Sequence, residues 1–450
     1  MQYCCHLGGR AIDRGTSTPQ SDHLGPCRVV GCSDFLGLLV TGVVLMATTP
    51  LAAWAAGFAI TAQGAAAIGK SSAFTAQADD PSALFYNPAG IAQLRTAALL
   101  VGTSVIIPHT EYRPESSGAP AREDRQIFFP PYLYVTVPLG RTFTAGLGVF
   151  SPFGVGTEWP LDWDGRFQVT SISVRTTSIN PTLAWRPAES VAVAAGVNVS
   201  VVNLKYRRAL NLAAFGPTTP EGDVSLRGDA RAVGFNGGIL ITPARWWRVG
   251  ASLRSRLHAE VKDGHADFSV PAPLSGAFAD GSIRTEVDLP PSLRLGVFLQ
   301  PTPKWNVEFG AAWTGWSTID RLTIEFANGL PADTTPFSWK NAMAYSLGTE
   351  YRWTSFRMRG GYTYDVTPIP DETVSPLLPD GNRQWWSVGV GTTGEWWSLD
   401  AAYQLILFDR VKANTFGTRF SSAAPPIDAR ANGSYRSHAH VVGVSAGYRF

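Results

Sequence analysis

The stretch WNVEFGAAWT, residues 305–314, alternates between two kinds of side chain from one residue to the next. In an extended chain, one face would carry its apolar members, which are Trp305, Val307, Phe309, Ala311 and Trp313. The opposite face would carry its polar and small members, which are Asn306, Glu308, Gly310, Ala312 and Thr314. A period of two residues predicts a β-strand with one oily and one polar face.

The same alternation runs from Thr96 to the end of the chain. The last segment sets Val442, Val444, Ala446, Tyr448 and Phe450 against Gly443, Ser445, Gly447 and Arg449. Between Leu293 and Leu299 apolar residues again alternate with polar or small ones, and only Phe298 breaks the pattern. A soluble β-sandwich could show this alternation as well, so the connections between strands must distinguish it from a membrane barrel.

The connections alternate between very short and long ones. Short connections are expected at Leu139–Arg141, Pro187–Glu189, Pro243–Arg245, Pro301–Pro303, Tyr351–Arg352 and Thr393–Glu395. Long ones are expected around residues 108–125, 151–168, 208–227, 264–280, 327–338, 367–381 and 412–435. Short periplasmic turns, longer extracellular loops and an even strand number are typical of outer-membrane barrels. The sequence therefore predicts an all-β membrane protein, an antiparallel outer-membrane β-barrel of about fourteen strands.

Tryptophan placement supports the same orientation. A group of tryptophans lies beside the short connections, namely Trp185, Trp246, Trp247, Trp305, Trp353, Trp396 and Trp397. Amphipathic rings prefer the headgroup level of a bilayer, and core tryptophans of a sandwich would not cluster at one class of turn. Because every backbone group must be paired in hydrocarbon, membrane strands of this kind have to close into a barrel.

The first 55 residues are interpreted as an N-terminal extension followed by an export signal. Arg28 supplies a positive charge, Phe35–Met46 forms an apolar core, and Ala53-Trp54-Ala55 offers small residues for cleavage. This core is too short to cross a bilayer comfortably as a permanent helix, which favours a cleaved signal. The alternative to an export signal is a buried helix or a membrane anchor. The cysteines all precede the cleavage point, and they are Cys4, Cys5, Cys27 and Cys32. The mature chain would therefore contain no disulfide and no thiolate metal site.

Composition narrows the functional classes. A formal net charge of +2 gives no excess that would attract nucleic acid. An enzyme such as a lipase or protease would need a nucleophile beside a base, and His258, His438 and His440 accompany no diagnostic motif. We therefore expect a protein that is not an enzyme and that has no cofactor, metal or nucleic-acid partner. A general diffusion porin remains an alternative to a specific transporter.

Short motifs follow one another along the chain in a specific order. The first block contains Ala56-Gly57-Phe58, Ala65–Gly69, Ala78–Ala83 and Asn87-Pro88-Ala89. The later motifs are Ser151–Gly154, Gly165–Phe167, Ile179–Pro181, Leu289–Gly296, Arg359–Asp365 and Thr367–Asp371. Each is weak alone, but together they cover nearly all of the chain from Ala56 to Phe450. In this order they resemble the FadL-type outer-membrane long-chain fatty acid transporter family, which also includes importers of aromatic hydrocarbons.

The resemblance implies three parts. Residues 1–55 would be the extension and signal peptide, residues 56–94 a hatch inside the lumen, and residues 95–450 the transmembrane barrel. Gly57 would belong to the hatch, and Asn87, Pro88 and Ala89 would turn the chain toward the first strand. Asn and Pro are turn formers, so a plain structural turn is the alternative for this motif.

The resemblance also implies passive uptake of hydrophobic small molecules, with long-chain fatty acids as the first choice and aromatic hydrocarbons as the alternative. The ligand would bind an apolar lumenal pocket near Phe58, the hatch would move, and the ligand would leave sideways beside a kink in the third strand. That strand, Thr142–Phe150, holds Gly146 and Gly148, and glycines permit a bend. Relief of crowding in the wall is the alternative role of these glycines.

A fatty acid carboxylate needs a cation, and a guanidinium offers paired donors. Cations that face inward by parity are Arg248, Arg254, Arg256 and Arg294, and Lys205 joins them if a bulge shifts the register near Val202. Most lumenal arginines would instead pair with carboxylates such as Glu308, Glu350 or Asp400. The choice among these cations stays open.

Partners and location follow from the same resemblance. We expect a monomer in the outer membrane of a Gram-negative cell, surrounded by outer-membrane lipid. The C-terminal Phe450 would be recognised by the barrel-assembly machinery.

Overall fold

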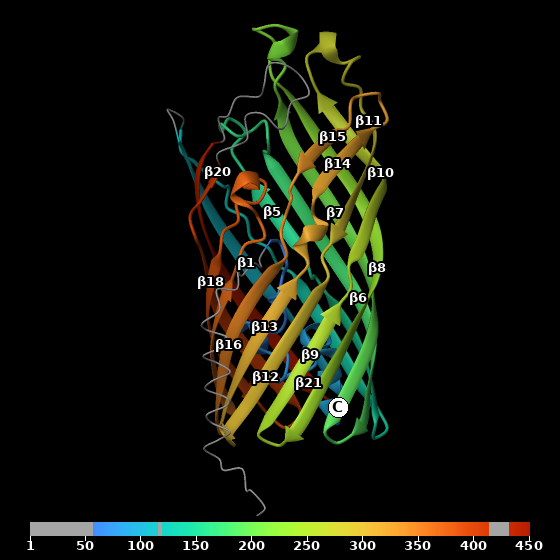
Figure 1. Ribbon diagram of the computed structural model, residues 1–450, viewed down its shortest axis with the longest axis vertical. Coiled ribbons are helices and arrows are strands. Elements are labelled where there is room, and N and C mark those ends of the chain that lie inside the picture. Colours follow the sequence, from blue (N-terminus) through green and yellow to red (C-terminus); the bar gives the residue numbers. More distant parts are fainter. Residues whose placement is uncertain (1–56, 116–118, 414–431) are drawn as a thin grey trace, which may run out of the picture. The chain divides into compact units, whose positions relative to one another are not determined.

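The computed structural model describes residues 57–115, 119–413 and 432–450. The predicted export signal and its extension lie outside these residues. Among the described residues, no helix is both long and apolar enough to cross a membrane. Twenty-one strand segments form one antiparallel sheet (Figure 1).

The segments combine into a closed barrel of fourteen strands. Some barrel strands are single segments: β1 (Ala98–Pro114), β6 (Ser171–Ala188), β7 (Val191–Leu210), β8 (Gly222–Ala244), β17 (Phe356–Asp365), β18 (Arg383–Thr393) and β21 (Gly433–Arg449). The others consist of two successive segments: β2 (Ala121–Arg122) with β3 (Pro131–Leu139), β4 (Phe143–Phe150) with β5 (Gly154–Glu158), β9 (Trp247–Arg254) with β10 (Leu257–Ser269), β11 (Gly281–Leu289) with β12 (Ser292–Thr302), β13 (Trp305–Thr314) with β14 (Arg321–Phe326), β15 (Asp333–Pro336) with β16 (Ala342–Trp353), and β19 (Trp397–Phe408) with β20 (Val411–Ala413).

Closure is made by the first and last strands. β1 pairs with β21 from Ala98 opposite Arg449 to Pro114 opposite Gly433 without interruption. A closed ladder leaves no free strand edge in the hydrocarbon. The prediction of an antiparallel barrel of about fourteen strands is therefore confirmed.

The two faces of the strands are those expected from the alternation. On β13, Trp305 and Phe309 are exposed on the outside, whereas Asn306 and Glu308 are buried inside. Phe298, which breaks the alternation on β12, is completely buried on the inner face. The oily face is thus the lipid-facing surface of the wall, and the polar face lines the lumen.

One short turn lies three residues from its predicted position. Tyr351 and Arg352 continue β16, and the chain reverses at Thr354-Ser355 because Trp353 still pairs with Phe356. The other short connections lie where the sequence placed them. The exposed tryptophans beside these turns are Trp185, Trp246, Trp305, Trp353 and Trp396. The C-terminus lies at the same end of the barrel (Figure 1).

Several expected loops are strands. β7 and β8 remain paired up to Leu210 opposite Gly222, so the connection between them is shorter than the predicted 208–227. On the outer face of this part, ion pairs replace the apolar residues, as between Arg207 and Asp223 at 2.8 Å. The inner face stays apolar, because Val224 and Leu226 pack in a buried cluster with residues of the neighbouring strands. An antiparallel ladder can continue into water with one polar and one packed face, so the polar composition predicted loops where there are strands.

The described N-terminal segment, residues 57–94, is enclosed by the strands (Figure 1, blue). It contains the short helices α2 (Ala65–Ile68), α3 (Ala83–Tyr86) and η1 (Pro88–Gln93), and nearly all of its residues are buried. Further short helices lie in the connections between strands: η2 (Ala213–Phe215), η3 (Ala272–Leu274), η4 (Trp316–Thr318) and η5 (Asp371–Thr373).

Buried charges join the N-terminal segment to the wall. The Glu308 carboxylate accepts hydrogen bonds from the backbone N–H groups of Ala76 and Gln77, at 2.8 and 2.7 Å. Lys70 is completely buried and donates to the side chains of Gln77 and Asn306. Burial lowers the pKa of the Lys70 ammonium, and the negative charge of Glu308 opposes this effect. These bonds fix the segment against β13.

A second group of charges lies near the short turns. Arg359 contacts Glu350 at 2.8 Å and Asp400 at 2.6 Å, and Arg352 contacts Glu350 at 2.8 Å and Asp79 at 3.5 Å. The expectation that lumenal arginines pair with such carboxylates is confirmed for these two residues.

Asn87 ties the end of the N-terminal segment to the barrel. Its amide donates to the carbonyls of Thr75 at 2.9 Å and Ile239 at 3.0 Å, and its oxygen accepts from the N–H of Ala89 at 3.2 Å. Pro88 occupies the first turn of η1, where a missing N–H costs nothing. The motif therefore forms a turn that is hydrogen-bonded to β8.

The lipid-facing wall can be tested with a charge. Leu295→Arg should lower the free energy of unfolding by about 2–4 kcal/mol, because Leu295 is exposed on the oily face of β12, away from both ends. The matched control is Leu139→Arg at the last position of β3, where the cost should be about 0–1 kcal/mol. Denaturant titration of the barrel in lipid vesicles measures both. Equal costs would contradict this assignment of the membrane-facing wall.

Candidate functional site

The third barrel strand is interrupted between β4 and β5. β4 pairs with β3 on one side and β6 on the other, whereas β5 pairs only with β6 among the described residues. The last ladder pair before the interruption is Leu133 with Val149. The two strands meet again where the N–H of Asp124 donates to the carbonyl of Glu158 at 2.7 Å. We call the unpaired region between residues 125–132 and 150–157 the wall gap.

The wall gap does not lie at Gly146 and Gly148, where the sequence analysis placed the kink. Both residues are within the continuous part of β4 and are paired on both sides. A Cβ atom at Gly146 would come within 2.6 Å of Leu84. Gly146 therefore makes room for the N-terminal segment. This role resembles the alternative given for these glycines, which was to relieve crowding in the barrel wall.

The start of the N-terminal segment supplies the hydrogen bonds that the interrupted strand lacks. The N–H of Ile60 donates to the carbonyl of Pro152 at 2.9 Å, and the N–H of Gly154 donates to the carbonyl of Phe58 at 3.0 Å. Ala59 and Phe153 are thus paired as in an antiparallel ladder. Residues 58–60 act as a short strand on the inner side of the interruption.

Phe58 lies in a cluster of aromatic rings. Its ring centroid is 5.0 Å from that of Trp316, 5.9 Å from that of Phe153 and 5.9 Å from that of Trp339, each with edge-to-face geometry. Such pairs contribute about 0.5–1.5 kcal/mol each beyond the area that they bury. Phe58 is therefore held by packing from the interruptions of three different barrel strands.

A buried ion pair clamps the residue before Phe58. Asp380 accepts a hydrogen bond from the N–H of Gly57 at 3.1 Å, and Arg383 donates to the carbonyl of Gly57. Arg383 and Asp380 also contact each other at 2.9 Å. Gly57 has a φ of +63°, and a Cβ there would come within 2.6 Å of the Trp316 ring. Only glycine fits this close approach without strain.

Residues 59–61 separate two cavities. The inner cavity, of about 80 Å³, lies on the side of Phe85, Arg254 and Arg294. The outer cavity, of about 530 Å³, extends from Gly57–Ala62 to the wall gap and reaches Phe128 and Phe129. Its apolar lining also includes Ile106, Val174, Leu378, Ile406, Phe408 and Val441. Ala59, Ile60, Thr61, Phe153 and Trp385 border both cavities.

Arg254 and Arg294 both line the inner cavity, as inward parity predicted. Their guanidinium groups lie over the Phe85 ring, at 5.4 and 5.3 Å from its centroid. Arg254 also donates to the side chain of Asn198, whereas Arg294 has no hydrogen bond or ion pair with any described residue. Asp365 is the only acidic side chain among the described residues that line this cavity. Two guanidinium groups therefore share this cavity with one carboxyl group.

Two of the predicted inward cations lie outside the lumen. Arg256 is exposed and contacts Asp288 at 3.2 Å, because the chain changes parity at Ser255 between β9 and β10. The N–H of Ser255 donates to Phe235 at 2.8 Å, and the next inward residue is Leu257 rather than Arg256. Lys205 is also exposed, because β7 pairs with β8 without the bulge that its inward placement required.

Arg248 faces inward but lies away from both cavities. It donates to the carbonyl of Gln77 at 3.1 Å and to the side chain of Gln93, and its guanidinium stacks 4.2 Å from the centroid of Phe298. It therefore holds the N-terminal segment. This contact also explains why a Phe occupies an inward position on β12.

Sequence reasoning missed Asp380, Arg383 and Trp385. The motif Thr367–Asp371 had marked the loop before β18, but nothing in the sequence indicated that this loop folds back onto Gly57. Asp380 and Arg383 lie three residues apart at the entry to β18, a spacing that permits their ion pair but does not indicate the distant contact with Gly57.

The chain is similar to known membrane proteins over most of its length. Residues 44–450 match the protein family described as outer membrane protein transport protein (OMPP1/FadL/TodX). The long-chain fatty acid transport protein of Escherichia coli O6:H1 is 24% identical over 390 residues, which are 78% of this chain and 86% of that protein.

Solved structures with the same fold include a Pseudomonas aeruginosa FadL homologue, with a TM-score of 0.78 and 20% identity over 88% of this chain and 100% of that one. The Pseudomonas putida toluene transporter TodX gives a TM-score of 0.62 and 17% identity over 82% of this chain and 94% of that one.

The clamp on Gly57 can be tested by removing one charge. Arg383→Met should cost about 3–5 kcal/mol of unfolding free energy, because it leaves the buried Asp380 carboxylate unpaired. Arg256→Met is the matched control, since its ion pair with Asp288 is exposed and should be worth about 0–1 kcal/mol. Thermal or denaturant unfolding measures both variants. A small loss in Arg383→Met would mean that Asp380 and Arg383 do not hold the start of the segment.

Proposed function

Because this chain belongs to the outer-membrane transport protein family that includes FadL and TodX, we propose that it imports long-chain fatty acids through the wall gap. The protein lies in the outer membrane and transports hydrophobic compounds, as its family does. The observation that carries the finer proposal is the position of residues 59–61 between a cationic inner cavity and an apolar cavity that reaches the wall gap.

The N-terminal segment is the hatch of this transporter. Its buried contacts with β8 and β13, through Asn87 and Glu308, support a closed resting state. The contacts of residues 57–60 are different in kind, because they consist of two hydrogen bonds to the Asp380–Arg383 ion pair, two backbone hydrogen bonds and ring packing. Opening therefore needs only residues 57–61 to move, while the rest of the segment stays in place.

Ligand binding requires this movement. The inner cavity of about 80 Å³ is smaller than the roughly 150 Å³ cavity that holds a benzene molecule in an engineered protein, so it cannot hold an alkyl chain as it stands. The outer cavity of about 530 Å³ has the size of a ligand pocket. Displacement of Phe58 and residues 59–61 would join the two, with Phe58 as the pocket residue that moves.

Arg254 and Arg294 bind the carboxylate. Arg294 lies over the Phe85 and Tyr86 rings but has no hydrogen-bond or ion-pair partner among the described residues, and a guanidinium in a partly desolvated cavity attracts an anion strongly. Trp385 supports an acceptor-bearing ligand as well, because its buried indole N–H has no hydrogen-bond partner among the described residues and it borders both cavities. A buried donor of this kind is normally satisfied.

Release is lateral. The alkyl chain follows the apolar lining of the outer cavity to the wall gap, where the Phe128 ring lies against Gly156. Ile127 and Phe129, which also border the cavity, are among the exposed apolar residues of the wall. Movement from an apolar cavity into lipid needs no energy source, because the ligand stays out of water throughout.

Import of an aromatic hydrocarbon is the second candidate. The four-ring cluster of Phe58, Phe153, Trp316 and Trp339 supports it, since flat rings pack well edge to face. A hydrocarbon would make no use of Arg294 or of the Trp385 N–H, which is why fatty acids are preferred.

Assembly as a monomer is part of the proposal. Phe450 is exposed at the end of β21, its N–H donates to the carbonyl of Ala97 at 2.9 Å, and its ring packs edge to face with that of Tyr448. Its exposed ring supports recognition by the barrel-assembly machinery.

Uptake measurements test the substrate class. Cells that lack their own transporter and express this chain should gain uptake of radiolabelled oleate, and Arg294→Gln should lower it at least tenfold because the carboxylate loses its partner. Toluene uptake is the matched readout and should not depend on Arg294. If oleate uptake does not rise above that of the empty strain, the fatty acid proposal is wrong, and a gain of toluene uptake alone would favour the second candidate.

Blocking the exit tests lateral release. Val155→Trp should reduce oleate uptake several-fold, because Val155 borders the outer cavity beside the wall gap. Oleate binding to the purified protein should persist. Val201→Trp on the lipid face of β7 is the control and should transport normally. Normal uptake by Val155→Trp would show that ligand leaves by another route.

A further inference from the structure

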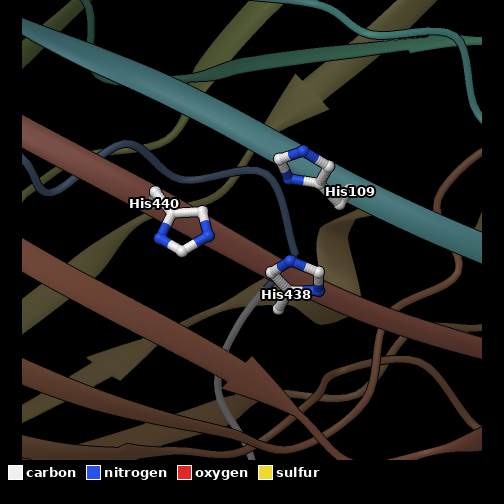
Figure 2. A group of neighbouring side chains, drawn as sticks. All are labelled: His109, His438 and His440. Carbon is white, nitrogen blue, oxygen red and sulfur yellow. The ribbon is translucent and has the colours of Figure 1, made fainter.

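Three histidines gather where β1 meets β21 (Figure 2). His109 and His438 are direct cross-strand partners, and His440 lies two residues further along β21. The rings of His109 and His438 are stacked, with 4.8 Å between centroids and 2° between planes. The His440 ring stands nearly perpendicular to both. One nitrogen of each ring lies within 4.8 Å of the others.

The cluster is on the outer side of the wall. Ala439 and Val441, which flank His440, are buried, and Val441 packs with Ile68 of the N-terminal segment. Successive side chains of a strand point to opposite faces, so His438 and His440 point away from the lumen. Val442 continues this outer face and is exposed. The cluster lies beside the outer cavity, because His438 is among the residues that line it.

The outer face changes from apolar to charged at the level of the histidines. On the side of the short turns it is apolar, with Val442 and Val444 exposed on β21. On the side away from the short turns it is charged, with Glu111 bound to Arg122 at 3.0 Å and the exposed Arg436 opposite Glu111. His438 lies ten residues from Tyr448 in the ring of aromatic residues near the short turns, which in tilted strands is about 25 Å along the membrane normal. The cluster is thus at the outer membrane–water interface.

Two of the three rings have a nitrogen that is set up as a ligand. The Nδ1 atom of His109 is buried and has no hydrogen-bond partner among the described residues. The Nδ1 atom of His440 is 2.8 Å from the Tyr403 hydroxyl on β19. A hydrogen bond at one ring nitrogen fixes the tautomer and leaves the other nitrogen as a metal ligand.

We propose that His109, His438 and His440 bind one divalent transition-metal ion of the Zn²⁺ or Cu²⁺ class on the outer wall. Imidazole nitrogens bind Zn²⁺ at about 2.0–2.1 Å, so tetrahedral ligands are about 3.4 Å apart. Nitrogens that already lie within 4.8 Å reach this spacing by small side-chain rotations. Hard cations such as Mg²⁺ and Ca²⁺ prefer oxygen and would not bind here.

The position predicts a structural effect. His109 belongs to β1, whereas His438 and His440 belong to β21, so the ion would cross-link the first and last strands of the barrel. A ligand that binds only the folded barrel stabilises it by mass action. The thermal unfolding temperature of the wild-type barrel should therefore rise when Zn²⁺ is added.

Metal titration of the full chain tests the proposal. The protein is purified from outer membranes with a tag that contains no histidine, its thiols are alkylated, and it is stripped with a chelator before Zn²⁺ is titrated calorimetrically. One Zn²⁺ per chain should bind in the wild type. Each of His109→Gln, His438→Gln and His440→Gln should weaken binding at least tenfold and abolish the rise in unfolding temperature. The control is the double variant His258→Gln/His265→Gln, which should bind like the wild type.

A second measurement needs no variant. Bound Zn²⁺ should protect His109, His438 and His440 of the wild-type protein from chemical modification by diethylpyrocarbonate, as read by mass spectrometry, and should leave His265 reactive. The proposal is overturned if the wild type binds no stoichiometric Zn²⁺, if the three single variants bind it like the wild type, or if the three histidines are not protected.

Discussion

The structure depends on one constraint, which is that backbone N–H and C=O groups in hydrocarbon must find partners within the protein. The closed ladder from β1 to β21 meets it almost everywhere. The third strand departs from it after Phe150, where pairing with the second strand stops. There Phe58 and Ile60 of the N-terminal segment bond to residues 152–154 from the inside. The same residues that satisfy the interrupted strand also separate the inner cavity from the outer one, so the proposed gate and the hydrogen-bond satisfaction of the strand are the same contact.

The charges inside the barrel divide into two groups with different tasks. Glu308 and Arg248 bind the backbone of the N-terminal segment and hold most of it against the wall. Arg254 and Arg294, by contrast, line a cavity together with the carboxyl group of Asp365. Most of the buried charge therefore holds the N-terminal segment in the barrel, and only the two guanidinium groups near Phe85 remain for the ligand site that we propose. The number of inward arginines is therefore larger than the number assigned to the proposed site.

Sequence alternation predicted the wall well, because Trp305, Glu308 and Phe309 each obey a single local rule that holds wherever one face meets lipid. It failed where the inward-facing residues switch between even and odd positions. The parity switch at Ser255 sends Arg256 outward, and no residue type at that position announces it. Gly146 and Gly148 suggested a kink, but glycine serves close packing as often as bending, and here Leu84 occupies the space. The clamp by Asp380 and the pairing of His109 with His438 depend on contacts between residues far apart in the chain, so no local pattern could predict them.

In the transport that we propose, residues 58–60 must leave the interrupted strand. Cysteines at positions 59 and 153 would test this requirement, because Ala59 and Phe153 are directly paired and antiparallel partners of this kind have Cα separations that a disulfide can span. In cells that express the double variant Ala59→Cys/Phe153→Cys, oleate uptake should be blocked under oxidising conditions and restored by a reductant. Equal uptake in the oxidised and reduced states, with the disulfide verified by mass spectrometry, would contradict the account.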